Sequence, residues 1–256
     1  LVMAYNLINK MNTVVDIINI SKAFGSHVVL NNVSLKVEES ENMVVFGQSG
    51  TGKSVLLKCM VGLLEPDSGE IFIEGNNILK LKIAELNVVR KNIGFLFQGA
   101  ALYDSMSVRE NLEFPLIRHF NYSSDEREER VKAVLEKVSL EEAIDKMPSE
   151  LSGGMKKRIG LARSIITEPK LMLYDEPTTG LDPITSKEIS LLILELQKSL
   201  KMTSIVVTHD LLCAEIIADR AIVLNEGVVQ HEGTINELTS SRDTFLPSWF
   251  VKLMFF

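Results

Sequence analysis

Short apolar runs and amphipathic stretches alternate along this chain of 256 residues, and the alternation predicts its main elements. Continuous apolar runs are typical of strands that are buried on both faces. Such runs occupy residues 43–46, 93–97, 171–174, 204–208 and 221–224. A long helix is expected between the third and fourth runs, over residues 184–200. Strands separated by helices in this way predict a parallel sheet that is covered on both faces.

Strands of a second kind are expected elsewhere. Residues 33–37 alternate apolar and polar side chains, which predicts a half-buried antiparallel strand. Residues 14–20 and 71–73 also have strand character, and residues 225–227 have the composition of a hairpin turn. These segments favour a mixed sheet with an antiparallel β subdomain.

The middle of the chain is helical instead. Residues 108–168 contain no strand-like run, and Ser123 and Glu126 form a plausible capping box. A further helix is expected after residue 153, and its charges are interpreted mainly as a solvated basic face: Lys156, Lys157, Arg158 and Arg163. We therefore expect an α/β fold whose sheet lobe carries an inserted α-helical lobe at about residues 99–165.

A glycine-rich loop follows the first buried strand and precedes an apolar helix. It fits the pattern G-x-x-x-x-G-K-[ST] with Gly47, Gln48, Ser49, Gly50, Thr51, Gly52, Lys53 and Ser54. The glycines let consecutive backbone N–H groups form a concave cradle for phosphate, at the positive end of the helix dipole. Lys53 adds a charge for the β- and γ-phosphates, and Ser54 adds a hydroxyl for Mg²⁺. The loop predicts a nucleotide site.

Two adjacent carboxylates close the strand at residues 171–174. In phosphate-loop enzymes an acid at such a strand end holds Mg²⁺, and Asp175 fits that role. Adjacent residues on a strand point to opposite faces, so Glu176 is expected to act separately, by polarising a water aimed at the γ-phosphate. An acidic cap at the end of a strand is the alternative interpretation.

Gln98 and His209 each follow a predicted parallel strand, at the edge where open α/β sheets bind ligands. A glutamine amide there can reach Mg²⁺ or the attacking water, and a histidine can donate to the γ-phosphate. Phe24 offers an aromatic face for adenine, although a core position is the simpler interpretation of that residue.

A second hydroxyl-plus-glycine motif lies in the helical lobe. Ser152, Gly153 and Gly154 begin a predicted helix and therefore form another candidate anion site. Two half-sites on one chain make sense if two copies pair head to tail with two-fold symmetry. Each ATP would then lie between the phosphate loop of one copy and residues 152–154 of the other.

Charge and cysteine content restrict the class of protein. A net charge of −7 argues against broad nucleic-acid binding. Cys59 and Cys213 lie in apolar helical patterns and are interpreted as buried, reduced thiols. The chain contains no charge-free apolar run of 18 residues and no signal-peptide pattern, so we expect a soluble, cytosolic protein.

Together, these residues resemble the ATP-binding cassette (ABC) transporter ATPases over about residues 14–232. The matching motifs are the Walker A loop 47–54, Gln98, the signature 151–155, the Walker B residues Asp175 and Glu176, the D-loop 180–183 and His209. The resemblance implies a phosphate-loop NTPase fold of the ABC type, two copies that enclose ATP, Phe24 stacked on adenine, and Asp182 beside the nucleotide. It also implies that hydrolysis drives integral membrane permease subunits, whose groove should lie beside Gln98, at residues 99–107.

The chain departs from the family pattern at two positions. Ser40 stands where a glycine often precedes the strand before Walker A, and Val55 replaces the commoner threonine. Neither position touches phosphate in the family, so the interpretation of the nucleotide site is unchanged.

Within the family, residues 97–103, 147–150 and 182–185, together with Met155, look most like the Mla-type ATPases, which move phospholipids between bacterial membranes. This similarity implies a permease, a periplasmic MCE lipid-binding protein, a small STAS-domain partner, and a peripheral place on the cytoplasmic side of the inner membrane. Related importers of small solutes such as amino acids share parts of each stretch and stay an alternative.

The sequence disfavours two classes of ABC protein outside transport. A cassette that acts on nucleic acid or the ribosome is disfavoured by the acidity of the chain and by its single set of motifs. A regulatory cassette that only binds ATP is disfavoured by the presence of Glu176 and His209.

We assign residues 13–240 to a single nucleotide-binding domain and residues 241–256 to a C-terminal extension, and give residues 1–12 no structural role. The extension is rich in aromatic residues, including Trp249 and Phe250. It could pack on its own domain, dock on a neighbouring subunit or contact a membrane surface.

Overall fold

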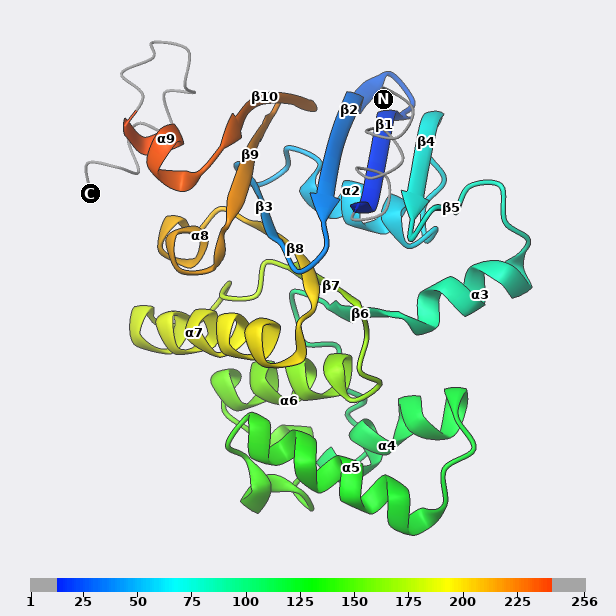
Figure 1. Cartoon of the computed structure of the whole chain (residues 1–256). Coiled ribbons are helices and arrows are strands. Elements are labelled where there is room, and N and C mark those ends of the chain that lie inside the picture. The colour runs from blue at the N-terminus through cyan, green and yellow to red at the C-terminus, as the bar shows by residue number, and fades with distance from the viewer. Residues whose placement is uncertain (1–12, 241–256) are drawn as a thin grey trace, which may run out of the picture.

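The computed structural model describes residues 13–240, which form two sheets and a helical lobe (Figure 1). The smaller sheet has the order β2-β1-β4-β5 and the larger one the order β10-β9-β3-β8-β7-β6. The strands are β1 (Thr13–Phe24), β2 (His27–Glu38), β3 (Asn42–Phe46), β4 (Ser68–Ile73), β5 (Asn76–Asn77), β6 (Ile93–Leu96), β7 (Leu171–Asp175), β8 (Thr203–Thr208), β9 (Arg220–Asn225) and β10 (Val228–Gly233). The helices are α2 (Lys53–Met60), α3 (Ile83–Lys91), α4 (Val108–His119), α5 (Ser124–Lys137), α6 (Gly153–Ile165), α7 (Pro183–Leu200), α8 (Leu211–Ile217) and α9 (Ile235–Ser240).

The strand registers confirm the predicted mixed α/β architecture. The five strands β9, β3, β8, β7 and β6 are parallel neighbours, whereas β10 pairs antiparallel with β9 across the expected turn. In the smaller sheet, β1 pairs antiparallel with both β2 and β4. All five continuous apolar runs therefore lie in the parallel part, and the alternating segment lies in the antiparallel part.

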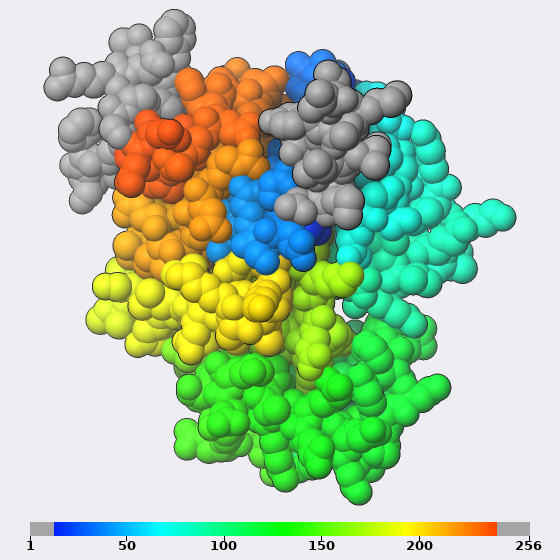
Figure 2. Space-filling view, in the orientation of Figure 1, coloured from blue at the N-terminus to red at the C-terminus, as the bar shows by residue number. Residues whose placement is uncertain are grey.

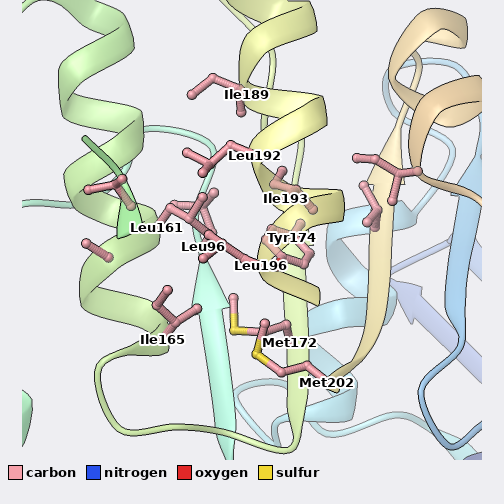
Figure 3. Packing of buried hydrophobic residues seen from close by; sticks show 14 of the residues in the cluster. Leu96, Leu161, Ile165, Met172, Tyr174, Ile189, Leu192, Ile193, Leu196 and Met202 are labelled. Carbon is pink, nitrogen blue, oxygen red and sulfur yellow. The ribbon is translucent and has the colours of Figure 1, made fainter. Parts of the chain in front are cut away.

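The larger sheet separates two cores. On β3, Met43 and Val45 face a core shared with α2 and the smaller sheet, whereas Val44 and Phe46 face a core shared with α6, α7 and α8. Because side chains alternate along a strand, an unbroken apolar run supplies both cores. Figure 3 shows the second core, where helices α6 and α7 pack over Leu96 of β6 and Tyr174 of β7.

Both predicted thiols are buried in these cores. Burial raises the pKa of Cys59 to about 11 and that of Cys213 to about 12. Both groups are therefore protonated and unreactive at neutral pH.

Helices α4, α5 and α6 form the helical lobe, which Figure 2 shows as a green mass beside the yellow surface of α7. The predicted capping box at the start of α5 is present, with Ser123 accepting from the Glu126 N–H and the Glu126 carboxylate accepting from the Ser123 N–H. A second capping box, Ser107 with Glu110, begins α4.

The domain limits at residues 13 and 240 stay predictions, and the proposed extension 241–256 lies outside the described residues.

The expectation of a solvated basic face on α6 is wrong for two of its charges. The Lys157 side chain is buried, and Arg163 donates to the backbone oxygen of Ala100 while its guanidinium lies over the Tyr103 ring. This face of α6 packs on the segment that follows β6, so its long side chains make contacts with backbone instead of water.

Within the part of the chain that the structure describes, no helix has the length and apolar content needed to cross a membrane.

Candidate functional site

The glycine loop lies between the end of β3 and the start of α2, as predicted. Gly50 and Gly52 have φ of 85° and 99°, a conformation that side-chain-bearing residues rarely adopt. A Cβ on Gly52 would lie 2.7 Å from the Val29 oxygen, and one on Gly47 would lie 2.5 Å from the Leu224 oxygen. The loop is therefore packed so closely against β2 and β9 that only glycine fits at Gly47 and Gly52.

A cavity of about 330 Å³ opens above the loop. It is lined by Val29, Ser49, Gly50, Gly52, Lys53, Ser54, Val55, Gln98, Glu176 and His209. The structure thus brings residues predicted from four separate segments of the chain to one place. Val29 of β2 was not predicted, because nothing in the local sequence distinguishes it from an ordinary strand residue.

Lys53 is the first residue of α2 and is only 5% exposed. Its ammonium donates to the backbone oxygens of Gly47 (2.6 Å) and Gln48 (2.8 Å) and pairs with the Glu176 carboxylate at 3.2 Å. The lysine is therefore held by its own loop and by one buried carboxylate, so an incoming phosphate would have to compete with these partners.

Asp175 and Glu176 make separate contacts in the structure, but the reason predicted from the sequence is wrong. Strand β7 ends at Asp175, and Glu176 has a left-handed backbone with φ of 50°, so strand alternation does not separate the two side chains. Asp175 accepts a hydrogen bond of 2.7 Å from the Ser54 hydroxyl, and Glu176 turns toward Lys53 and His209. A non-glycine residue in this conformation costs about 1–2 kcal/mol and must be held by its surroundings.

His209 follows β8, and its Nδ1 lies 2.8 Å from the second oxygen of Glu176. Lys53, Glu176 and His209 therefore form a continuous polar chain along the edge of the sheet. Gln98 lines the same cavity two residues beyond the end of β6.

Burial raises the pKa of Asp175, and its hydrogen bond from Ser54 partly offsets that effect.

Four of the other predicted groups lie elsewhere, beside the start of α7. Ser152 caps α6 by accepting from the Met155 N–H, and a Cβ on Gly154 would lie 2.8 Å from the Thr185 methyl group. Asp182 caps α7 by accepting from the N–H groups of Ile184 and Thr185. Residues 152–154 and Asp182 therefore share one neighbourhood, separate from the lining of the cavity above the phosphate loop.

Phe24 is half exposed at the end of β1 and is not among the residues that line the cavity. The simpler interpretation of this residue, a core position, is therefore wrong. Gln48 and Thr51 of the loop are joined by a hydrogen bond of 2.9 Å from the Thr51 hydroxyl to the Gln48 backbone oxygen.

The site suits a magnesium nucleotide on its own chemistry. Backbone N–H groups of a glycine loop, a helix start and a buried lysine are an anion site that matches a polyphosphate. The Ser54 hydroxyl and the Asp175 carboxylate, joined at 2.7 Å, are the oxygen ligands that Mg²⁺ prefers. A parallel sheet with this loop at its edge, and with a second acid and a histidine beside it, defines a phosphate-loop nucleotide hydrolase.

Comparisons with known proteins identify the family to which this nucleotide hydrolase belongs. Residues 30–179 match the profile described as ABC transporter, which covers more than half of the chain. The chain belongs to the ABC transporter family, as an ATP-binding subunit similar to the Mla type, and it is an ATPase.

Three relatives show the range within the family. The chain is 41% identical to Protein TRIGALACTOSYLDIACYLGLYCEROL 3, chloroplastic, of Arabidopsis thaliana, over 91% of this chain and 72% of the relative. It is 40% identical to the intermembrane phospholipid transport system ATP-binding protein MlaF of Haemophilus influenzae, over 90% and 87% of the two chains. It is also 40% identical to the methionine import ATP-binding protein MetN of Carboxydothermus hydrogenoformans, over 86% and 63%.

A solved structure confirms the fold. The ATP-binding cassette MJ0796, in a dimeric post-hydrolysis state with bound ADP and Pi, superposes with a TM-score of 0.79 at 34% identity. The match covers 86% of this chain and 98% of that protein. The predicted fold class and the predicted ATPase activity are therefore confirmed.

Proposed function

We propose that this chain hydrolyses ATP to energise a membrane permease that moves phospholipids between the inner and outer membranes of a bacterium. It would act at the cytoplasmic side of the inner membrane. The observation that carries the hydrolytic part is the contact chain beside the glycine loop, in which the buried Lys53 and Glu176 pair with each other and Glu176 also contacts the exposed His209. The phospholipid part rests on the 40% identity with MlaF over 90% of this chain.

On this proposal the loop residues 47–54 bind the phosphates, with Lys53 turning from Glu176 to the β- and γ-phosphates. Glu176 accepts a proton from the attacking water, and His209 holds that carboxylate and donates to the γ-phosphate. Ser54, Asp175 and Gln98 would hold Mg²⁺, which would neutralise charge on the phosphate oxygens. Phe24, exposed at the end of β1, offers its ring to adenine.

A second copy of the chain would complete the site. Residues 152–154 and Asp182 lie apart from the cavity of their own chain, on a surface where Ile184 is 75% exposed. A head-to-tail dimer would bring these groups over the phosphate loop of the other copy, where the start of α6 adds a second anion site. The dimeric state of the superposed cassette supports this pairing.

The permease would dock in a groove beside the segment that follows β6. The groove has a volume of about 520 Å³ and aromatic walls from Phe95, Phe97, Tyr103 and Phe114. Its cationic residues are Arg90, Lys91 and Arg163. These features favour a permease segment with apolar anchors and at least one carboxylate.

The groove can be tested by co-purification from membranes. Phe114→Asp places a charge among the aromatic walls, and we expect the permease to be lost while ATP hydrolysis by the isolated subunit is unchanged. Leu191→Asp on α7 is the matched control, because Leu191 is similarly exposed but does not line the groove. Retention of the permease by the Phe114 variant would place the docking surface elsewhere.

An importer of small solutes is the second candidate, favoured by the 40% identity with MetN. The two functions differ in what stimulates hydrolysis by the membrane complex. We expect mass spectrometry of the purified complex to find phospholipid and, among its proteins, MCE and STAS-domain partners. Stimulation of phosphate release by free methionine or another amino acid, with no effect of added phospholipid, would favour the importer instead.

A further inference from the structure

Helix α6 carries a buried lysine that none of the roles above uses. Lys157 is 6% exposed, although lysine is among the residues that are least often buried. Its ammonium donates to two backbone oxygens, those of Gln98 and of Glu176, the latter at 3.3 Å. No carboxylate within the described residues forms an ion pair with it.

The two oxygens belong to neighbouring segments of the proposed active site. Gln98 follows β6 and Glu176 follows β7, and these strands are parallel neighbours in the larger sheet. Both residues line the cavity above the phosphate loop, and their carbonyl groups accept from Lys157. One side chain from the helical lobe therefore joins the backbones of two residues that line this cavity.

The Glu176 backbone has a particular need for such a contact. Its left-handed φ of 50° is strained for a residue with a side chain, and its N–H donates to the Val207 oxygen at 2.9 Å. Lys157 binds the carbonyl of the same residue from the opposite lobe. A contact from the helical lobe therefore reaches the backbone of the residue whose carboxylate pairs with Lys53 and His209.

We propose that Lys157 is a positioning residue that couples the helical lobe to Gln98 and Glu176. The proposal rests on the function proposed above, in which these two residues act at the γ-phosphate. Lys157 lies five residues after Ser152 on the same helix, or about 7.5 Å along its axis. When the start of α6 closes on the nucleotide of a second copy, the rigid helix carries Lys157 with it and adjusts both carbonyls together.

The test compares Lys157→Met, Lys157→Gln and Lys156→Met in steady-state phosphate release. Methionine keeps the apolar stem and removes the donor, so we expect kcat to fall about tenfold while the Kd for ATP stays within about twofold, because misplacing a catalytic group slows chemistry without touching the binding loop. Glutamine keeps an N–H donor and should restore part of kcat. Lys156→Met, at the adjacent position, should match the unchanged chain.

A merely structural role would give a different result. It would lower the Tm of Lys157→Met and leave kcat per folded molecule unchanged, and that outcome would overturn the proposal. A double variant tests whether Lys157 acts through Glu176. If it does, adding Lys157→Met to Glu176→Gln should lower kcat little further. Full activity of Glu176→Gln alone would instead refute the proposed function. Full activity of Lys157→Met beside a slow Glu176→Gln would refute only the coupling.

Discussion

Replacing Glu176 by glutamine is the sharpest test of the proposed chemistry. The change keeps the size of the side chain and an oxygen acceptor, but removes the charge that pairs with Lys53 at 3.2 Å and the acceptor that pairs with His209 at 2.8 Å. A general base contributes about 10²–10⁴-fold, which corresponds to about 3–5 kcal/mol of transition-state stabilisation. We therefore expect phosphate release to fall at least about a hundredfold.

Binding of ATP should survive the same change. Glu176 pairs with the Lys53 ammonium and would therefore compete with phosphate for it. Glutamine removes that competitor, so the Kd for ATP should be no weaker than in the unchanged chain. Without nucleotide the variant should be less stable by about 1–3 kcal/mol, since breaking a buried ion pair is costly but Lys53 keeps its bonds to the Gly47 and Gln48 oxygens. Added ATP should therefore raise the Tm of the variant more than that of the unchanged chain.

The assay is phosphate release at saturating ATP, with equilibrium ATP binding and size-exclusion chromatography to detect a trapped dimer. Glu226→Gln is a matched control, because Glu226 has nearly the same left-handed φ of 48° but is exposed on the β9–β10 turn. It should leave turnover unchanged. Turnover of Glu176→Gln near that of the control would remove Glu176 from the role of base.

Three further predictions concern single residues. Ser152→Ala should slow only the hydrolysis that depends on dimer formation, and an enzyme that works as a monomer and is indifferent to this change would contradict the head-to-tail pairing. Tyr174→Phe should raise the free energy of unfolding by about 1–3 kcal/mol in urea denaturation, because the buried Tyr174 hydroxyl has no hydrogen-bond partner among residues 13–240; unchanged or lower stability would mean that the hydroxyl is satisfied. Ser40→Gly should stabilise the fold by about 0.5–1 kcal/mol, because Ser40 has φ of 62°, and a loss of stability in the same titration would show that its hydroxyl contact outweighs the strain.

The fold was predictable because its signals are local and repeated. Each parallel strand is a continuous apolar run, and the long helix α7 begins at a capping Asp182 followed by proline. The phosphate loop was predictable for a similar reason, since its glycines, Lys53 and Ser54 are adjacent in sequence. Parallel strands bring their carboxyl ends to one edge, which is why the sequence alone predicts that Gln98, Asp175 and His209 lie near the phosphate loop.

Contacts between lobes could not be predicted, because they depend on how two elements pack. Lys157 and its neighbour Lys156 are the same residue type at adjacent positions on α6, yet one is buried against the segment after β6 and the other is not. Asn111 shows the same limit within the helical lobe: its amide donates to the backbone oxygens of Tyr103, Met106 and Ser107, which fixes the segment that leads into α4. Periodicity identifies the buried face of a helix, but not which polar group a buried side chain meets there.

The left-handed backbone at Glu176 connects these observations. On strand geometry alone, its side chain would lie across the sheet from Asp175, but the turn at the strand end brings it to Lys53 and His209. The same carboxylate would therefore serve first as the counter-charge of Lys53 and, once phosphate replaces it there, as the group that faces water. Because Lys157 of α6 contacts the backbone of this strained residue, the coupling proposed above would let the position of the helical lobe control whether that exchange leads to hydrolysis.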